Sequence, residues 1–153
     1  MRKARAKKRP LLPDPRFNDT LVTRFVNNLM LDGKKSIAFN IFYDAIDIVS
    51  EKSEGNGLET WKEALNNVMP HVEVRSRRVG GANFQIPMQV RPDRKVTLGM
   101  KWMILATRKR NERSMAQKLA AEILAGSKGE GAAVKKRTVV HRMAEANKAF
   151  SHF

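Results

Sequence analysis

The 153-residue chain contains no cysteine, which excludes disulfides, thiolate nucleophiles and cysteine-based metal sites. A reducing cytoplasm is the simplest location for such a protein. Aromatic residues make up only 7% of the sequence, as is more typical of a helical protein with an aliphatic core than of an aromatic-rich β-protein. The longest stretch without a charged residue, Val79 to Val90, is too short and too polar to cross a membrane. No apolar run of signal-peptide length follows the basic N-terminus, so we expect a mature cytosolic chain.

Acidic residues are also scarce. The sequence has 30 Lys and Arg but only 15 Asp and Glu, a formal net charge of +15. A domain this basic repels itself unless a polyanion neutralises it, so a nucleic acid is the expected partner. The positive charge is unevenly distributed along the chain. Residues 1–13 carry six basic and no acidic groups, residues 14–73 carry six basic and ten acidic groups, and residues 74–153 carry eighteen basic and five acidic groups. We therefore expect the first half to supply the scaffold, and the N-terminal arm and second half to face the partner.

Apolar residues recur at helical spacing in six segments. The predicted helices cover about residues 19–31, 34–53, 58–69, 92–110, 115–125 and 132–148. Asn18 or Asp19 is expected to cap the first helix and Ser114 the fifth, while Pro92 suits the start of the fourth. The predicted fold is mainly α: a single-domain bundle of about six helices with one protruding β-hairpin and a flexible basic N-terminal arm. The arm is residues 1–13, and residues 14–153 are expected to form one helical domain that binds nucleic acid.

The hairpin is expected at about residues 72–90, where polar and apolar residues alternate on both sides of two glycines. A two-residue Gly-Gly turn would place Val74 opposite Pro87 and Arg75 opposite Ile86, and so mix the apolar and polar faces. A three-residue loop, Val79–Gly81, would instead place Val74 opposite Ile86 and leave Arg75 on the other face. We therefore predict the three-residue loop, with the hairpin arginines projecting into solvent.

The basic segment of the arm, Arg2 to Arg9, has no large apolar side chain to offset the entropy of ordering it, so we expect it to be disordered until it binds. A solubilising or targeting tail is the alternative. The equally basic second half of the chain favours an arm that binds nucleic acid.

Further basic clusters lie on the hairpin and near the predicted helix ends. Alternative explanations exist: arginines protect an exposed strand edge from aggregation, and cations near a helix C-terminus complement its dipole. Together the clusters outnumber what these explanations require. The candidate RNA-binding residues are Arg2, Lys3, Arg5, Lys7, Lys8, Arg9, Lys34, Lys35, Arg75, Arg77, Arg78, Arg91, Arg94, Lys95, Arg108, Lys109, Arg110, Arg113, Lys135, Lys136 and Arg137.

Trp61 and Trp102 fall on apolar helix faces and are expected in the core, which leaves Phe84 near the hairpin tip as the better candidate for stacking on a base. The three histidines have neither metal-ligand spacing nor a nucleophile nearby in sequence. No phosphate-binding glycine motif is present either. We expect no catalytic residue, no metal and no cofactor.

Several stretches resemble the signature of the small-subunit ribosomal protein seven family. They are DTL (19–21) through FV (25–26), DGKK (32–35), IFYDA (41–45), VRSRRVGGA (74–82), QVRP (89–92), EGAAVKKR (130–137) and HRMAEAN (141–147). Because they occur in order along nearly the whole chain, chance similarity is implausible.

The resemblance implies a primary binder of 16S ribosomal RNA that nucleates assembly of the head of the small subunit. It also implies a place at the subunit interface near the decoding centre, with the hairpin beside the exit-site tRNA and small-subunit proteins nine and eleven as neighbours. No membrane and no small-molecule substrate are implied. The matched RNA-facing positions are Lys34, Lys35, Arg75, Arg77, Arg78, Arg91, Lys135, Lys136 and Arg137. The arm carries over only as a region.

In this interpretation Lys and Arg neutralise phosphates where several RNA helices meet and fix their geometry. The first alternative is an architectural or helix-turn-helix protein that binds DNA, because basic helices and a ribbon also suit that role. The second is an enzyme acting on RNA. Competition between folded ribosomal RNA and duplex DNA would separate the first alternative from the main hypothesis, and a nuclease assay would test the second.

Overall fold

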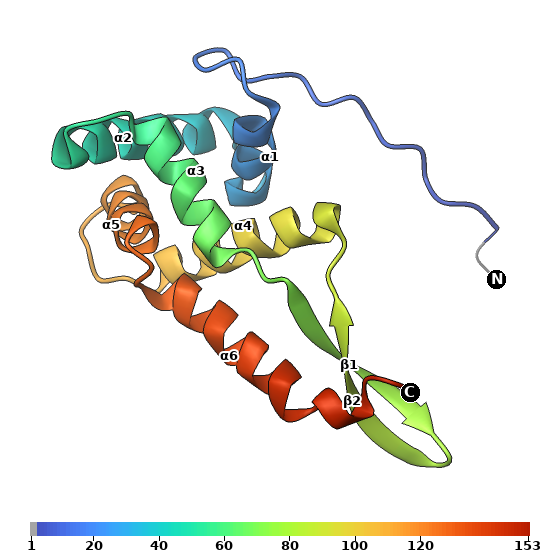
Figure 1. The fold of residues 1–153 in the computed structure, drawn as a ribbon. Coiled ribbons are helices and arrows are strands. Elements are labelled where there is room, and N and C mark those ends of the chain that lie inside the picture. The colour runs from blue at the N-terminus through green and yellow to red at the C-terminus, as the bar shows by residue number, and fades with distance from the viewer. Residues whose placement is uncertain (1–2) are drawn as a thin grey trace.

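The computed structural model describes residues 3–153 and, over that range, contains six α-helices, one short 3-10 helix and one antiparallel hairpin (Figure 1). The elements are α1 (Thr20–Leu29), α2 (Lys35–Ser53), α3 (Gly57–Val68), β1 (Val72–Val79), β2 (Ala82–Gln89), α4 (Pro92–Arg108), α5 (Met115–Ser127), α6 (Ala132–Ala146) and η1 (Lys148–Phe150). The predicted mainly α fold is confirmed. None of the helices described is long and apolar enough to span a membrane.

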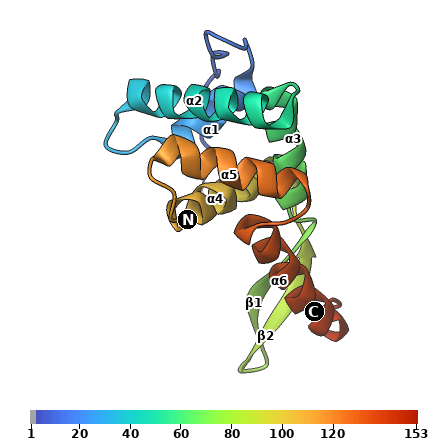
Figure 2. The same ribbon diagram turned by 90° about the vertical axis from the view of Figure 1, so that its left-hand side faces the viewer.

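The molecule has two parts that differ in shape. Helices α1, α2, α3 and α5 pack together, with α4 crossing below them (Figure 1). The hairpin and α6 project side by side from this bundle in both views (Figures 1 and 2), and η1 packs against β2 at their far end. Residues 3–13 have no regular secondary structure and extend away from the bundle.

The chain is fixed where the arm ends, at the buried side chain of Asp14. Its carboxylate accepts hydrogen bonds from the backbone N–H groups of Arg16, Phe17 and Asp19, and from the hydroxyl of Tyr43 at 2.9 Å. Asp19 in turn caps α1, as predicted, by accepting from the N–H of the second helical residue. Ser114 caps α5 in a capping box, also as predicted.

The core is centred on Trp61, which is fully buried. Its ring meets those of Phe25 and Phe42 edge-on, at centroid distances of 5.4 and 5.1 Å. The prediction that Trp61 belongs to the core is confirmed. Ile37 also lies at helical spacing with the apolar residues of the second predicted helix, but it is 53% exposed because it lies in the first turn of α2, at the rim of the bundle.

Several helix ends differ from the predicted ones by two residues. Helix α1 stops at Leu29, because the chain turns at Asp32 and Gly33, which both have positive φ. Helix α4 also ends early, at Arg108, and α5 continues to Ser127. Apolar spacing alone does not mark these ends, which are set by the backbone turns that follow.

Helices α2 and α3 approach closely at Gly57. A Cβ atom there would lie 2.4 Å from Ser50 Oγ and 2.5 Å from the carbonyl oxygen of Ile46. We expect Gly57→Ala to lower the free energy of unfolding by about 1–3 kcal/mol, because the helices must separate. The control is Gly55→Ala, whose Cβ would meet nothing closer than 3.8 Å. Urea denaturation measures both, and equal stabilities of the two variants would contradict this account of the crossing.

The hairpin is present, but the predicted register is wrong. Val74 pairs with Pro87 and Arg75 with Ile86, around a two-residue turn at Gly80-Gly81. Both glycines have positive φ, 57° and 84°, as a tight hairpin turn with two left-handed residues requires. The mixed faces of this register are tolerated because Glu73 and Ile86, on one face, are both buried, and both strands of the hairpin contact α6.

Candidate nucleic-acid interface

The base of the hairpin is joined to α4 by Glu73, which is only 9% exposed. Its carboxylate accepts from Arg94 Nε at 2.9 Å and from Arg75 at 2.8 Å. The Arg94 hydrogen bonds, followed by that from Arg75, lower the pKa of Glu73 despite its burial. The predicted register required Arg75 to project freely into solvent. In the structure its guanidinium group is instead held by Glu73. Two guanidinium groups share one carboxylate, so the cluster keeps a net positive charge.

The distal half of the hairpin is joined to the C-terminus. The ring of Phe84 lies 5.3 Å from that of Phe150 and 5.1 Å from that of Phe153. Arg77 donates to the backbone carbonyl of Phe153, while Arg78 is exposed. Phe84, predicted as the stacking residue, instead packs within this cluster of phenylalanines.

Histidines connect the hairpin base with α6. The backbone N–H of His71 donates to Nε2 of His141 at 3.0 Å, and Nδ1 of His71 lies 3.0 Å from Lys95 Nζ. Burial, with the nearby charges of Arg137 and His71, lowers the pKa of His141 below its usual value of 6.5. The neutral form, which can accept from His71, is therefore the one that the fold favours.

We expect the protein to lose stability as the pH falls below about 6.5. The pKa of His141 is lower in the folded chain, so the unfolded chain binds more protons in this range and unfolding becomes easier. His141→Gln, which keeps an acceptor but does not titrate, should flatten this part of the stability profile. His152→Gln at the exposed C-terminus is the control. The measurement is the thermal midpoint of each protein between pH 5 and 8. If the midpoint of His141→Gln falls with pH as steeply as that of the wild type, His141 is not the cause of the loss.

Arg110 is the candidate with the most complete internal pairing. It contacts Glu112 and the buried Glu122, each at 2.9 Å. Glu122 Oε1 also accepts from the backbone N–H of Ala133 in the first turn of α6. These contacts give Arg110 a clear structural role, whereas its neighbours Arg108 and Arg113 are exposed.

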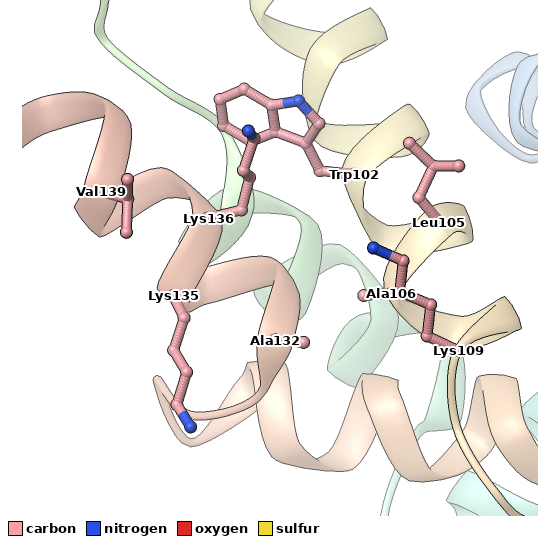
Figure 3. A pocket seen from close by; sticks show the side chains of 8 residues that line it. All are labelled: Trp102, Leu105, Ala106, Lys109, Ala132, Lys135, Lys136 and Val139. Atoms are coloured by element: carbon pink, nitrogen blue, oxygen red, sulfur yellow. The ribbon is translucent and has the colours of Figure 1, made fainter. Parts of the chain in front are cut away.

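A groove lies between α4 and α6. It encloses about 340 Å³ and is lined by Trp102, Leu105, Ala106, Lys109, Ala132, Lys135, Lys136 and Val139 (Figure 3). Trp102 packs on the core, as predicted, but is only partly buried and also faces this groove. A signal was present in the sequence: four consecutive apolar residues, Trp102 to Leu105, point to different sides of one helix, and the core cannot cover all of them.

Not all the candidates are brought together. The described arm residues Lys3, Arg5, Lys7 and Arg9 are exposed, and Lys8 pairs with the exposed Asp93 at 2.8 Å, which lowers the pKa of that carboxyl group. Arg2 lies outside the described residues.

The α1–α2 turn places Lys34 and Lys35 apart from the hairpin. Within the described chain, α2 packs against α1, α3 and α5 and makes no contact with α6 or the hairpin. Arg91 precedes α4, while Lys135, Lys136 and Arg137 lie in α6 beside the hairpin. In residues 3–153 no group of three or more His, Asp or Glu residues could hold a metal ion.

Comparison with known proteins identifies the family. The family model described as ribosomal protein S7p/S5e matches residues 1–148. Two relatives named small ribosomal subunit protein uS7 are 74% identical (Flavobacterium psychrophilum) and 75% identical (Christiangramia forsetii), each over 100% of this chain and 99% of the relative. A third, from Clostridium botulinum, is 53% identical over 99% of this chain and 97% of the relative. The chain therefore belongs to the ribosomal protein S7p/S5e family.

Proposed function

We propose that this chain is a primary binder of 16S ribosomal RNA that nucleates assembly of the head of the small ribosomal subunit. As a member of its family, the chain is a structural constituent of the small subunit of the cytoplasmic ribosome and not an enzyme. The proposal concerns how it acts there and which residues contact the RNA.

The observation that carries the proposal is the division of charge between the two parts of the fold. In the bundle, α2 and α3 contain the carboxylates Asp44, Asp47, Glu51, Glu59 and Glu63. In the projecting part, α6 carries four cations and the single carboxylate Glu145. The hairpin beside it adds three arginines against Glu73. Phosphate neutralisation by Lys and Arg supplies much of the affinity of proteins for nucleic acids, so RNA is expected on the projecting part and the arm.

The shape of the molecule suits contact with several RNA segments. The arm and the hairpin leave the bundle separately, and α6 lies along the hairpin (Figure 1). A protein with cations on such separate extensions can hold RNA helices in one relative arrangement, which later proteins recognise. Recognition is mainly of shape and backbone, because the deep major groove of A-form RNA does not admit a helix. The boundary between arm and domain, at residue 13, is part of this proposal.

The hairpin supports a more specific location. Its distal half is exposed, ends at Gly80-Gly81 and carries Arg77 and Arg78. We place this end beside the exit-site tRNA, at the subunit interface near the decoding centre, with small-subunit proteins nine and eleven as neighbours. The family resemblance supports this placement, and the exposed cations are suited to a second RNA.

The test is binding and assembly with purified components. We expect the chain to bind 16S ribosomal RNA with no other protein present, and duplex DNA to compete poorly at the same salt concentration. Leaving the chain out of a reconstitution should reduce incorporation of the other head proteins. Equal competition by duplex DNA, or normal head assembly without the chain, would contradict the proposal.

A further inference from the structure

The groove between α4 and α6 exposes apolar side chains that the core does not use. Leu105 is 52% exposed and Val139 43% exposed, and both line it together with Trp102. A second hollow, lined in part by Val140 and Met143, shares Trp102 and Lys136 with the first. The groove therefore continues from the end of α4 toward the base of the hairpin, with Trp102 near its middle.

The charge of the first hollow is of one sign, and the carboxylate that lines the second, Glu73, is already paired with Arg75 and Arg94. The eight lining residues of the first hollow include Lys109, Lys135 and Lys136 but no Asp or Glu. In Figure 3, Lys136 extends from α6 toward the indole of Trp102, and Lys109 extends into the space below Leu105, while Lys135 points away from the ring. The groove thus combines an aromatic ring with cations that come from two helices.

We propose that this groove holds one unpaired nucleotide of the ribosomal RNA, with its base stacked on Trp102 and its flanking phosphates at Lys136 and Lys109. This inference rests on the proposed function and adds a specific contact to it. Unpaired bases stack on aromatic side chains, and lysines beside the ring neutralise the attached backbone. A volume of about 340 Å³ falls in the range of pockets that hold small ligands.

The competing occupant is an apolar segment of another ribosomal protein. Leu105 and Val139 would suit such a segment. The three lysines favour a nucleotide, because a protein segment would have to bring acidic residues to match them, whereas every nucleotide carries a phosphate. The variants below separate the two occupants, because only a nucleotide contact affects binding to RNA alone.

The test is a titration of the full chain with 16S ribosomal RNA, followed by tryptophan fluorescence and by affinity across a salt series. The chain has two tryptophans, and Trp61 is fully buried, so quenching by RNA reports on Trp102. The variants are Trp102→Leu, Trp102→Phe and Lys136→Met. Lys52→Met on α2, beside Glu51, is the matched control. Thermal midpoints show whether each variant is folded. If Trp102→Leu does not fold, Lys136→Met still tests the inference, because Lys136 is exposed.

We expect RNA to quench Trp102 and Trp102→Leu to bind about tenfold more weakly, with an unchanged salt slope. Trp102→Phe should recover most of the affinity. Lys136→Met should make the slope of log affinity against log salt shallower by about 0.7–0.9, and Lys52→Met should leave it unchanged. Suppose that Trp102→Leu and Lys136→Met bind RNA as tightly as the wild type, and that RNA does not quench the wild-type fluorescence. This result overturns the inference about the groove but not the proposed function, since the chain still binds RNA. The same result with poor entry of these variants into reconstituted subunits assigns the groove to a protein. No binding of wild type to 16S ribosomal RNA overturns both this inference and the proposed function.

Discussion

Replacing Glu122 with alanine is expected to lower the free energy of unfolding by about 3 kcal/mol. The side chain is 1% exposed and holds two elements at once. One oxygen accepts from Arg110 at 2.9 Å, and the other accepts from the N–H of Ala133 at 3.1 Å. Alanine removes both contacts, so the first turn of α6 loses an acceptor for its N–H group and Arg110 loses its buried partner.

Two variants separate the parts of this effect. Glu122→Gln keeps an acceptor for Ala133 but removes the charge, so its loss should be smaller. Glu112→Ala removes the other partner of Arg110, which is 33% exposed, and should cost less than about 1 kcal/mol. Urea denaturation of the three variants gives the comparison. Equal losses for Glu122→Ala and Glu112→Ala would show that the buried contact is not what fixes α6.

Removing residues 1–13 is expected to weaken binding to 16S ribosomal RNA strongly while leaving stability nearly unchanged. The arm carries six cations and no anions. If all six contact phosphates, their loss makes the slope of log affinity against log salt shallower by about 4 to 5. The contact of the arm with the folded part through Lys8 and Asp93 is an exposed pair, which contributes little to stability.

A full-length variant with the six arm cations replaced by glutamine is the control for chain length. It should behave like the truncated chain in binding and like the wild type in melting. Unchanged RNA affinity in both variants would show that the arm serves another purpose, such as solubility.

The elements with local signals were predictable from the sequence. Asp19 and Ser114 have cap chemistry that depends only on neighbouring residues, and both cap their helices. Trp61 has apolar residues at helical spacing around it and is fully buried. The mainly α fold with one hairpin follows from the same local patterns, so it was predicted correctly.

The features that failed depend on residues far apart in sequence. The register of the hairpin was predicted for a ribbon with one apolar and one polar face, yet Glu73 is buried against Arg94 of α4 and β1 also packs on α6. Phe84 meets the C-terminal Phe153, a contact that no local pattern shows. The groove at Trp102 depends likewise on how α6 lies against α4. Which of the candidate cations contact RNA stays a prediction.

Photo-crosslinking of the chain to 16S ribosomal RNA, with the adducts located by mass spectrometry, tests the central claim most directly. That claim is that the cations of the arm, the α1–α2 turn, the hairpin, α4 and α6 form the RNA-binding surface, and that α3 and the acidic part of α2 beyond its first turn face away from the RNA. We predict adducts at residues such as Arg78, Lys109 and Lys136, and none at Lys52 of α2 or Lys62 of α3, which pairs with Asp19. Adducts concentrated at Lys52 and Lys62, with none on the hairpin or α6, would contradict the account.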